Sequence, residues 1–242
     1  MPVESINTLK SWINQASKIV FFGGAGVSTA SGIPDFRGPE GLYSIPSDVP
    51  PEIILSHRFF MNHPKEFYHF IKTHMNYCDV LPNDCHKALA KLEKQGKNII
   101  ILTQNIDGLH QKAGSSRVIE LHGSLQRFYC IKCKSPYTLD DIWHTDDLPR
   151  CTCGGIIKPD VVLFEEFLDQ TLLSQAIKAM EECDLLIVGG TSLSVYPAAN
   201  LIQYFHHGLA VLINKTLTNY DHFFDLIIRE PIDFVFKEML LK

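Results

Sequence analysis

Short apolar runs alternate along the chain with segments that have helical spacing. The runs that fit buried strands cover residues 18–22, 98–102, 118–121, 184–188, 209–213 and 225–228. Because these runs are almost continuously apolar, we expect each strand to be buried on both faces, as in a parallel sheet whose crossovers are helical. The pattern therefore predicts an α/β fold built on a doubly wound, Rossmann-like parallel sheet.

Two segments interrupt this alternation. Residues 39–82 are rich in proline, histidine and aromatic residues and have helical spacing over 64–75, whereas residues 124–159 contain four cysteines and few apolar positions. We expect the two segments to pack together as a small lobe that consists of a helical insert and a zinc ribbon. The larger, Rossmann-like nucleotide-binding domain is then formed by three remaining stretches, 1–38, 83–123 and 160–242.

Composition narrows the classes of function. The 242 residues include 22 basic and 27 acidic side chains, a net charge of −5 without blocks of one sign, so we expect no nucleic-acid partner. No apolar run approaches the ~20 residues of a membrane span, so we expect no membrane partner. The polar N-terminal helical pattern lacks an apolar signal core, and the seven cysteines do not suit a secreted disulfide framework. We therefore expect a cytoplasmic protein.

The first strand runs into the sequence GAGVSTASGIPDFRG, residues 24–38. Glycines at the end of a buried strand can bring backbone N–H groups close to a pyrophosphate, although a plain tight turn between strand and helix is an alternative. A dehydrogenase fingerprint would need a third glycine where Thr29 stands and a second strand soon afterwards. Residues 33–39 form a loop instead, which disfavours hydride transfer. Within this loop an acid, an aromatic ring and a guanidinium, Asp35, Phe36 and Arg37, stand beside the expected phosphate site, with an Asp35–Arg37 pair and a buried Phe36 as the alternative.

Polar residues follow the second and third strands. Gln104, Asn105 and Asp107 come directly after residues 98–102, and His122 follows residues 118–121. Ligands of doubly wound sheets bind at the carboxyl ends of the strands, so we expect these side chains to line one site. Asx turns for the first group, and a structural role for the histidine, are the alternatives. A histidine at this edge is suited to act as a general base near neutral pH.

The four clustered cysteines are Cys130, Cys133, Cys151 and Cys153. Their spacing, Cys-x-x-Cys and Cys-x-Cys, resembles the two knuckles of a zinc ribbon. Four thiolates favour a closed, tetrahedral and therefore structural Zn²⁺ site. We expect one zinc ion, and we expect the small lobe to unfold when it is removed.

Together these motifs resemble the sirtuins, the NAD-dependent protein deacylases, over nearly the whole chain. The resemblance rests on residues 24–38, 103–110 (TQNIDGLH), 122–123, the four cysteines, 158–166 (KPDVVLFEE), 189–199 (GGTSLSVYPAA) and 213–214. It implies that NAD is consumed as a co-substrate, that a protein or peptide carrying acyl-lysine is the other substrate, and that His122 and Asn105 are catalytic. The cofactor-binding residues that it implies are Gly24, Ala25, Gly26, Ile33, Asp35, Phe36, Arg37, Gln104, Asn105, Ile106, Asp107, Gly190, Thr191, Ser192 and Asn214.

The reaction that the resemblance implies begins when the acyl oxygen attacks C1′ of the nicotinamide ribose and expels nicotinamide. His122 then activates a ribose hydroxyl, and the products are free lysine, nicotinamide and O-acyl-ADP-ribose. The acyl-lysine is expected to pass Val162 and Phe164, while its peptide adds as a strand to an exposed edge.

Three positions depart from the family pattern. Gly23 stands where threonine is common, which we expect to loosen the turn. Glu165 stands at the glycine of Phe-Gly-Glu, which we expect to push a side chain into the peptide path. Ile71, three residues after Tyr68, stands at the arginine that accompanies a preference for acidic acyl groups. We therefore expect a deacetylase, or a deacylase for a longer neutral chain.

Two other functions stay open at this point. Sirtuin-like proteins include NAD-dependent protein ADP-ribosyltransferases, although retention of His122 and Asn105 favours deacylation. A catalytically idle NAD-sensing or scaffolding module is the second alternative, and the intact polar residues disfavour it.

Overall fold

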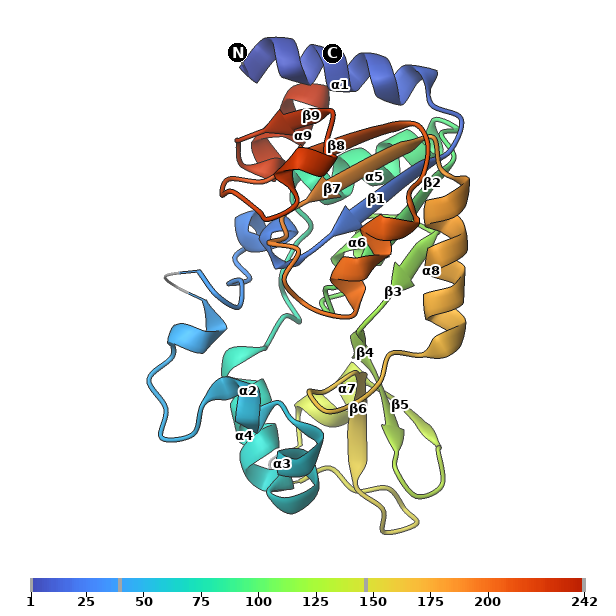
Figure 1. Cartoon of the computed structure of the whole chain (residues 1–242). Helices are drawn as coiled ribbons and strands as arrows, with labels where there is room; N and C mark the ends of the chain where they lie inside the picture. Colours follow the sequence, from blue (N-terminus) through green and yellow to red (C-terminus); the bar gives the residue numbers. More distant parts are fainter. Residues whose placement is uncertain (1, 39–40, 146–147, 241–242) are drawn as a thin grey trace.

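The computed structural model describes residues 2–38, 41–145 and 148–240, and its centre is a six-stranded sheet (Figure 1). The strand order is β3-β2-β1-β7-β8-β9, and all neighbours are parallel. A second, antiparallel sheet has the order β5-β4-β6. The strands are β1 (Ile19–Gly23), β2 (Ile99–Thr103), β3 (Val118–Glu120), β4 (Gly123–Cys130), β5 (Pro136–Thr138), β6 (Ile157–Val161), β7 (Leu185–Gly189), β8 (Leu209–Ile213) and β9 (Leu226–Ile228).

Helices cover both faces of the large sheet and one side of the small one. The α-helices are α1 (Pro2–Gln15), α2 (Pro51–Ile54), α3 (His57–Asn62), α4 (Pro64–His74), α5 (Asp84–Lys94), α6 (Leu109–Lys112), α7 (Leu139–Trp143), α8 (Gln170–Glu182) and α9 (Ile232–Leu240). Among the described residues, none of these helices is long and apolar enough to cross a lipid bilayer.

The apolar runs of the strands divide between two cores. Alternate residues of one strand face opposite sides of a sheet, so Phe21 packs with α1, α5 and α9, whereas Val20 and Phe22 pack with α8 and the 3-10 helix Ala198–Tyr204. Every residue of β1 and of β7 is buried. Burial on both faces explains why these strands have continuous apolar sequences.

The small lobe has its own core. Residues of α2 to α4 and α7 pack with β4 and β6 in a third apolar cluster, which includes Phe60, Phe67, Phe128 and Ile157. In Figure 1 these elements lie together at the bottom of the view, below the large sheet. The helical insert and the cysteine-bearing ribbon are therefore one packed unit, although a long stretch of sequence separates them.

The predicted fold class is confirmed: all six expected strands are present and parallel, with ends that differ by no more than one residue. The expected helix over 64–75 corresponds to α4. The boundaries of the three stretches and two insertions stay a prediction. Three of the boundary residues, 1, 39 and 242, lie outside the described residues.

Candidate active site

The loops that the sequence singled out meet at the carboxyl edge of the large sheet. Gly23 is level with Thr103 on one side and with Gly189 on the other, and Gly189 is level with Ile213. The segments that begin at Gly24, Gln104, Gly190 and Asn214 therefore leave the sheet side by side. This is the edge at which doubly wound sheets bind their ligands.

The first loop leaves β1 in an extended conformation. Gly24 is extended, with φ −125°, so the turn does not use a positive φ there. The N–H of Gly26 donates to the carbonyl of Gly190 at 2.8 Å, which ties the first loop to the one after β7. Ala25 is the first residue of a 3-10 helix, so its backbone N–H has no acceptor within that helix. Gly23 is the last residue of β1 and is in register with both neighbouring strands, and its expected loosening of the turn stays a prediction.

Ser28 connects the first loop to the second, a contact that the sequence analysis did not predict. Its Oγ donates to Asp107 Oδ2 at 2.6 Å and accepts from Asn105 Nδ2 at 3.0 Å. Asp107 is buried, and its Oδ1 accepts from the N–H of Leu109 at 2.8 Å. Burial raises the pKa of Asp107, against the hydrogen bond from Ser28, which lowers it. The serine inside the GAGVS motif is the only sequence signal for this contact.

The second loop also contacts the loop that follows β7. Gln104 Nε2 donates to Thr191 Oγ1 at 3.3 Å, and the same hydroxyl accepts from the N–H of Leu193 at 3.1 Å. Ser192 Oγ lies 2.7 Å from Ser194 Oγ and is exposed. Asn214, at the end of β8, donates from Nδ2 to the carbonyl of Thr216 at 3.0 Å. The polar residues expected on one half of the site thus lie on three adjacent loops.

His122 is held in one orientation. Its Nδ1 lies 3.0 Å from the carbonyl oxygen of Gln104, an atom that can only accept, so Nδ1 carries the proton. Burial lowers the pKa of His122, against the hydrogen bond to Gln104, which raises it. Gly123, with φ 76°, follows directly, and a Cβ there would collide with the carbonyl oxygen of Asp160. Glycine at this position allows β6 to pass close to the histidine.

Residues 33–37 and 106 lie between the sheet and the small lobe. Ile33 is buried, and Phe36 and Ile106 pack against the core of the small lobe. Asp35 Oδ1 accepts from the N–H of Gly38 at 2.6 Å, and the Arg37 guanidinium lies 5.7 Å from the centre of the Tyr43 ring. The structure therefore gives Asp35 and Arg37 separate partners rather than a mutual ion pair.

The expected peptide-binding residues come directly after β6. The N–H of Val162 donates to the carbonyl of His122 at 3.0 Å, which fixes the start of this segment beside the histidine. Phe164, two residues later, is 43% exposed. The structure thus brings the residues expected to contact the acyl-lysine to the same edge as the residues expected to bind the cofactor.

The four cysteines form one cluster, and their sulfur atoms all lie within 4.8 Å of one another. Cys130 Sγ is 3.5 Å from Cys153 Sγ, and Cys133 Sγ is 3.5 Å from Cys151 Sγ. A tetrahedral zinc ion with Zn–S bonds of about 2.3 Å requires sulfur separations of about 3.8 Å, so the cluster fits zinc. A Cβ at Gly155 would lie 2.6 Å from Cys130 Sγ, which explains why the second knuckle continues with glycine.

Comparisons with known proteins agree with this arrangement. The family model described as the Sir2 family matches residues 24–197. A Clostridium acetobutylicum protein named NAD-dependent protein deacetylase is 50% identical, with 98% of this chain and 99% of the relative covered. A Clostridium perfringens protein of the same name is 52% identical, with 95% and 96% covered.

Solved structures give the same result. A Sir2 complex with a peptide and NAD+ has a TM-score of 0.86 and 38% identity, with 97% of both chains covered. A Sir2 structure with an acetylated peptide has a TM-score of 0.87 and 35% identity at the same coverage. The fold, the loops at the sheet edge and these matches together show that the chain belongs to the Sir2 family of sirtuins.

Proposed function

We propose that the chain is an NAD-dependent protein-lysine deacylase, and specifically a deacetylase that releases free lysine, nicotinamide and O-acyl-ADP-ribose. The observation that carries the proposal is the orientation of His122 at the edge where the cofactor and peptide loops meet. The names of the relatives and the peptide complexes among the similar structures support it.

The loops at the carboxyl edge suit NAD. Gly24, Ala25 and Gly26 would hold the pyrophosphate, with Arg37 nearby, while Gly190, Thr191, Ser192 and Asn214 would border the adenosine half. Ile33, Asp35, Phe36, Gln104, Asn105, Ile106 and Asp107 would surround the nicotinamide and its ribose. When bound, NAD supplies an electrophilic ribose carbon that the acyl oxygen can attack. Ser28 would hold Asn105 and Asp107 in place before NAD arrives, because it hydrogen-bonds both side chains.

The chain's own contribution to proton transfer lies in His122. Since Nδ1 donates to the carbonyl of Gln104, the lone pair of the neutral ring is on Nε2, the atom that would accept a proton from a ribose hydroxyl. The lowered pKa of His122 keeps this lone pair available at neutral pH. The activity should therefore fall as the pH drops below the pKa of His122, where Nε2 becomes protonated.

The small lobe supports a neutral acyl group. Tyr68 is buried, and its hydroxyl donates to the carbonyl of Ile157 at 2.7 Å. Ile71, at the position of the arginine that would pair with an acidic acyl group, is also buried in the core of the small lobe. Neither side chain is available to bind a succinyl carboxylate, and an acyl panel of acetyl, succinyl, myristoyl and lipoyl peptides tests this preference.

We also propose a cytoplasmic location. Four closely spaced thiols serve as zinc ligands in a reducing compartment, whereas an oxidising compartment favours disulfides.

The experiment that tests the function compares the wild-type chain with His122→Ala on an acetyl-lysine peptide and NAD. We expect the wild type to form O-acetyl-ADP-ribose, and the variant to lose about 10²- to 10⁴-fold in kcat because its general base is absent. Calorimetry should show that NAD binding is retained, since the cofactor loops are intact.

The outcomes separate the possible functions. Labelling of protein from radiolabelled NAD without O-acetyl-ADP-ribose would indicate an ADP-ribosyltransferase. NAD binding without any turnover would indicate a sensing or scaffolding module. An unchanged rate in the variant would exclude His122 as the base while leaving the reaction itself intact.

A further inference from the structure

The segment after β6 carries the sequence Phe164-Glu165-Glu166, with a glutamate where sirtuins commonly have glycine. Glu165 has φ 75°, the left-handed region that glycine adopts readily and other residues rarely adopt. The backbone thus keeps the conformation of the glycine pattern although a longer side chain is present. Such an unfavourable backbone angle needs support from the surrounding structure.

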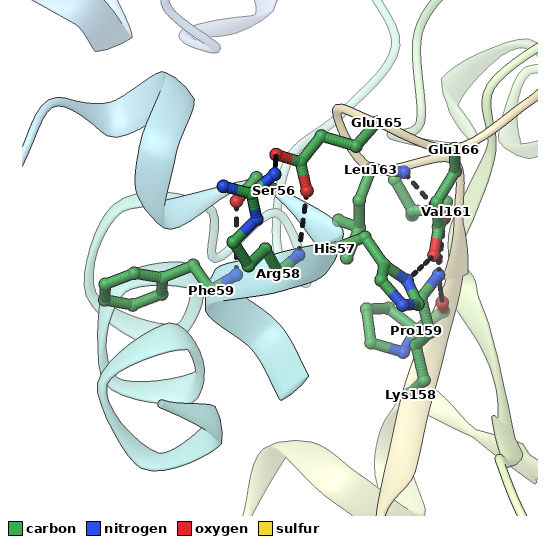
Figure 2. Close-up of polar contacts among 10 residues, drawn as sticks. All are labelled: Ser56, His57, Arg58, Phe59, Lys158, Pro159, Val161, Leu163, Glu165 and Glu166. Carbon is green, nitrogen blue, oxygen red and sulfur yellow. Dashed lines mark hydrogen bonds and ion pairs between the residues drawn. The ribbon is translucent and has the colours of Figure 1, made fainter. Parts of the chain in front are cut away.

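The carboxylate of Glu165 is held by the start of α3. Figure 2 shows it beside Arg58, on the helical insert. Its Oε2 accepts from the N–H of Arg58 at 3.1 Å, and its Oε1 lies 3.5 Å from Nη2 of the same residue. The side chain therefore contacts the helical insert, and its intrusion into the peptide path stays a prediction.

Backbone contacts place the two segments side by side. The N–H of Phe164 donates to the carbonyl of Leu55 at 3.1 Å, and the N–H of His57 donates to the carbonyl of Phe164 at 2.9 Å. These bonds form a single parallel bridge between Ser56 and Phe164, immediately before Glu165. The carboxylate of Glu165 thus extends a short backbone contact into a longer connection between the loop and α3.

Glu166, the next residue, has a different surrounding. Its Oε2 accepts from Lys158 Nζ at 3.0 Å and from the N–H of Leu163 at 2.9 Å, while its Oε1 lies 2.8 Å from His57 Nδ1 (Figure 2). Lys158 is 4% exposed, so loss of Glu166 would leave a buried cation without its carboxylate. A Glu166 variant would therefore disturb folding, whereas the exposed Glu165–Arg58 pair can be removed without that cost.

We propose that Glu165 is a positioning residue whose contact with Arg58 holds the loop after β6 against the helical insert. We call this contact the latch, and the loop after β6 the peptide-binding loop. The inference rests on the proposed function, because it concerns the loop to which the acyl-lysine peptide is expected to add. A peptide that pairs with a loop must order that loop, and a loop already held in place binds with a smaller loss of conformational entropy. The latch should therefore strengthen peptide binding and leave the cofactor site unaffected.

The test compares Glu165→Gly and Glu165→Gln with the wild type. We expect KM for an acetyl-lysine peptide to rise about three- to tenfold in Glu165→Gly, which loses one charge-assisted hydrogen bond and one exposed ion pair. The rise should be smaller in Glu165→Gln, whose amide oxygen can still accept from the N–H of Arg58, and kcat and KM for NAD should stay within about twofold in both variants. The glycine variant also relieves the strained backbone, so its thermal midpoint should be equal to or above that of the wild type. A purely structural role would change the midpoint and leave the peptide KM unchanged.

Two further variants sharpen the test. Arg58→Gln removes the ion pair but keeps the backbone N–H, so it should raise the peptide KM less than Glu165→Gly does. The double variant Arg58→Gln/Glu165→Gln should have nearly the same peptide KM as Glu165→Gln alone, because both changes remove the same ion pair. Glu66→Gln is the matched control. Glu66 Oε1 lies 3.8 Å from His63 Nδ1, and this exposed contact joins two residues of the same insert and does not involve the loop. This control should leave the peptide KM unchanged.

Hydrogen exchange in the free protein separates this proposal from the proposed function. Amides of residues 165–168 should exchange faster in Glu165→Gly than in the wild type, whether or not the chain deacetylates anything. If the wild type shows no deacetylation, the dissociation constant of the peptide replaces KM. An unchanged peptide KM or dissociation constant in both Glu165 variants, an equal change in Glu66→Gln, or an unchanged exchange rate would overturn the latch.

Discussion

The large domain and the small lobe reach a stable structure by different means. The six-stranded sheet is covered by apolar clusters on both faces, and each cluster combines strand residues with residues of the covering helices and loops. The small lobe has one apolar cluster, a three-stranded sheet, short helices and the four cysteines. Burial of apolar surface suffices for the first unit, whereas the second combines burial with a metal site. The two tryptophans report on them separately, because Trp12 packs against a core of the large domain and Trp143 against the core of the small lobe.

Of the changes considered, removal of zinc should separate the stabilities of the large domain and the small lobe the most. Binding of structural zinc contributes about 10–16 kcal/mol in small zinc-dependent folds, so a chelator should unfold the ribbon and abolish deacetylation. Fluorescence of Trp143 should change, while that of Trp12 and the helical circular dichroism of the large domain should persist. Cys151→Ser should have the same effect, and Cys78→Ser, outside the cluster, should have none. Simultaneous loss of both signals would show that the large domain also depends on the metal.

Removal of one buried ring from each core should sharpen the comparison. Phe21 is fully buried in the large domain and Phe128 is 2% exposed in the small lobe. Each Phe→Ala change should cost about 3–5 kcal/mol in the free energy of unfolding of its own unit. Urea titrations followed by Trp12 and by Trp143 measure the two costs. Only Phe128→Ala should also weaken zinc affinity, because metal binding and folding of the small lobe are linked.

Acid should affect the large domain through two buried histidines. The rings of His86 on α5 and His110 on α6 lie 4.7 Å apart, and no described residue hydrogen-bonds His86 Nε2 or either ring nitrogen of His110. Burial lowers both pKa values, that of His86 to about 4. The unfolded chain therefore binds protons below pH ~6.5 that the folded chain does not, so stability is greatest above this pH and falls as the pH drops towards 4.

The size of this acid effect can be measured. A shift of His86 from 6.5 to about 4 corresponds to about 3 kcal/mol in the free energy of unfolding. Urea titrations at a series of pH values should show a shallower decline for His110→Phe than for the wild type. His69→Gln changes an exposed histidine and should follow the wild-type curve. If the free energy of unfolding had the same pH dependence in all three proteins, His110 would not contribute to the acid effect.

The smallest expected differences concern two helix N-termini. Thr138 caps α7 in the small lobe, with Asp141 completing a capping box, and Asn83 caps α5 in the large domain. Thr138→Ala should cost about 1 kcal/mol. Asn83→Ala should cost more, because its Nδ2 also donates to the carbonyl of Val27 at 2.7 Å. Thermal unfolding of each variant, followed by the tryptophan of its own unit, checks the order.

Features of the molecule that depend on local sequence were predictable. The strands could be predicted because burial on both faces leaves a continuous apolar run, and the cysteine cluster because thiolate spacing reflects zinc geometry. The meeting of Gln104, Asn105, Asp107 and His122 followed from the rule that parallel strands end at one edge.

Features that depend on packing between distant segments were not predictable. The hydrogen bonds of Ser28 to Asn105 and Asp107 join residues almost 80 positions apart. The contact of Glu165 with Arg58 depends on where α3 lies, and α3 is more than 100 positions away in the sequence. The contact of His86 with His110 likewise depends on how α5 and α6 pack.

The pairing of Gly123 with Val161 has a consequence for the evolution of the protein. The whole zinc ribbon leaves and re-enters the large domain at one pair of adjacent residues, as a hairpin does, so its length adds little to the entropy of closing that loop. Insertions or deletions in the ribbon can then change its length without moving a strand of the central sheet. The residues between Gly123 and Val161 are therefore a segment whose length evolution or protein engineering can change.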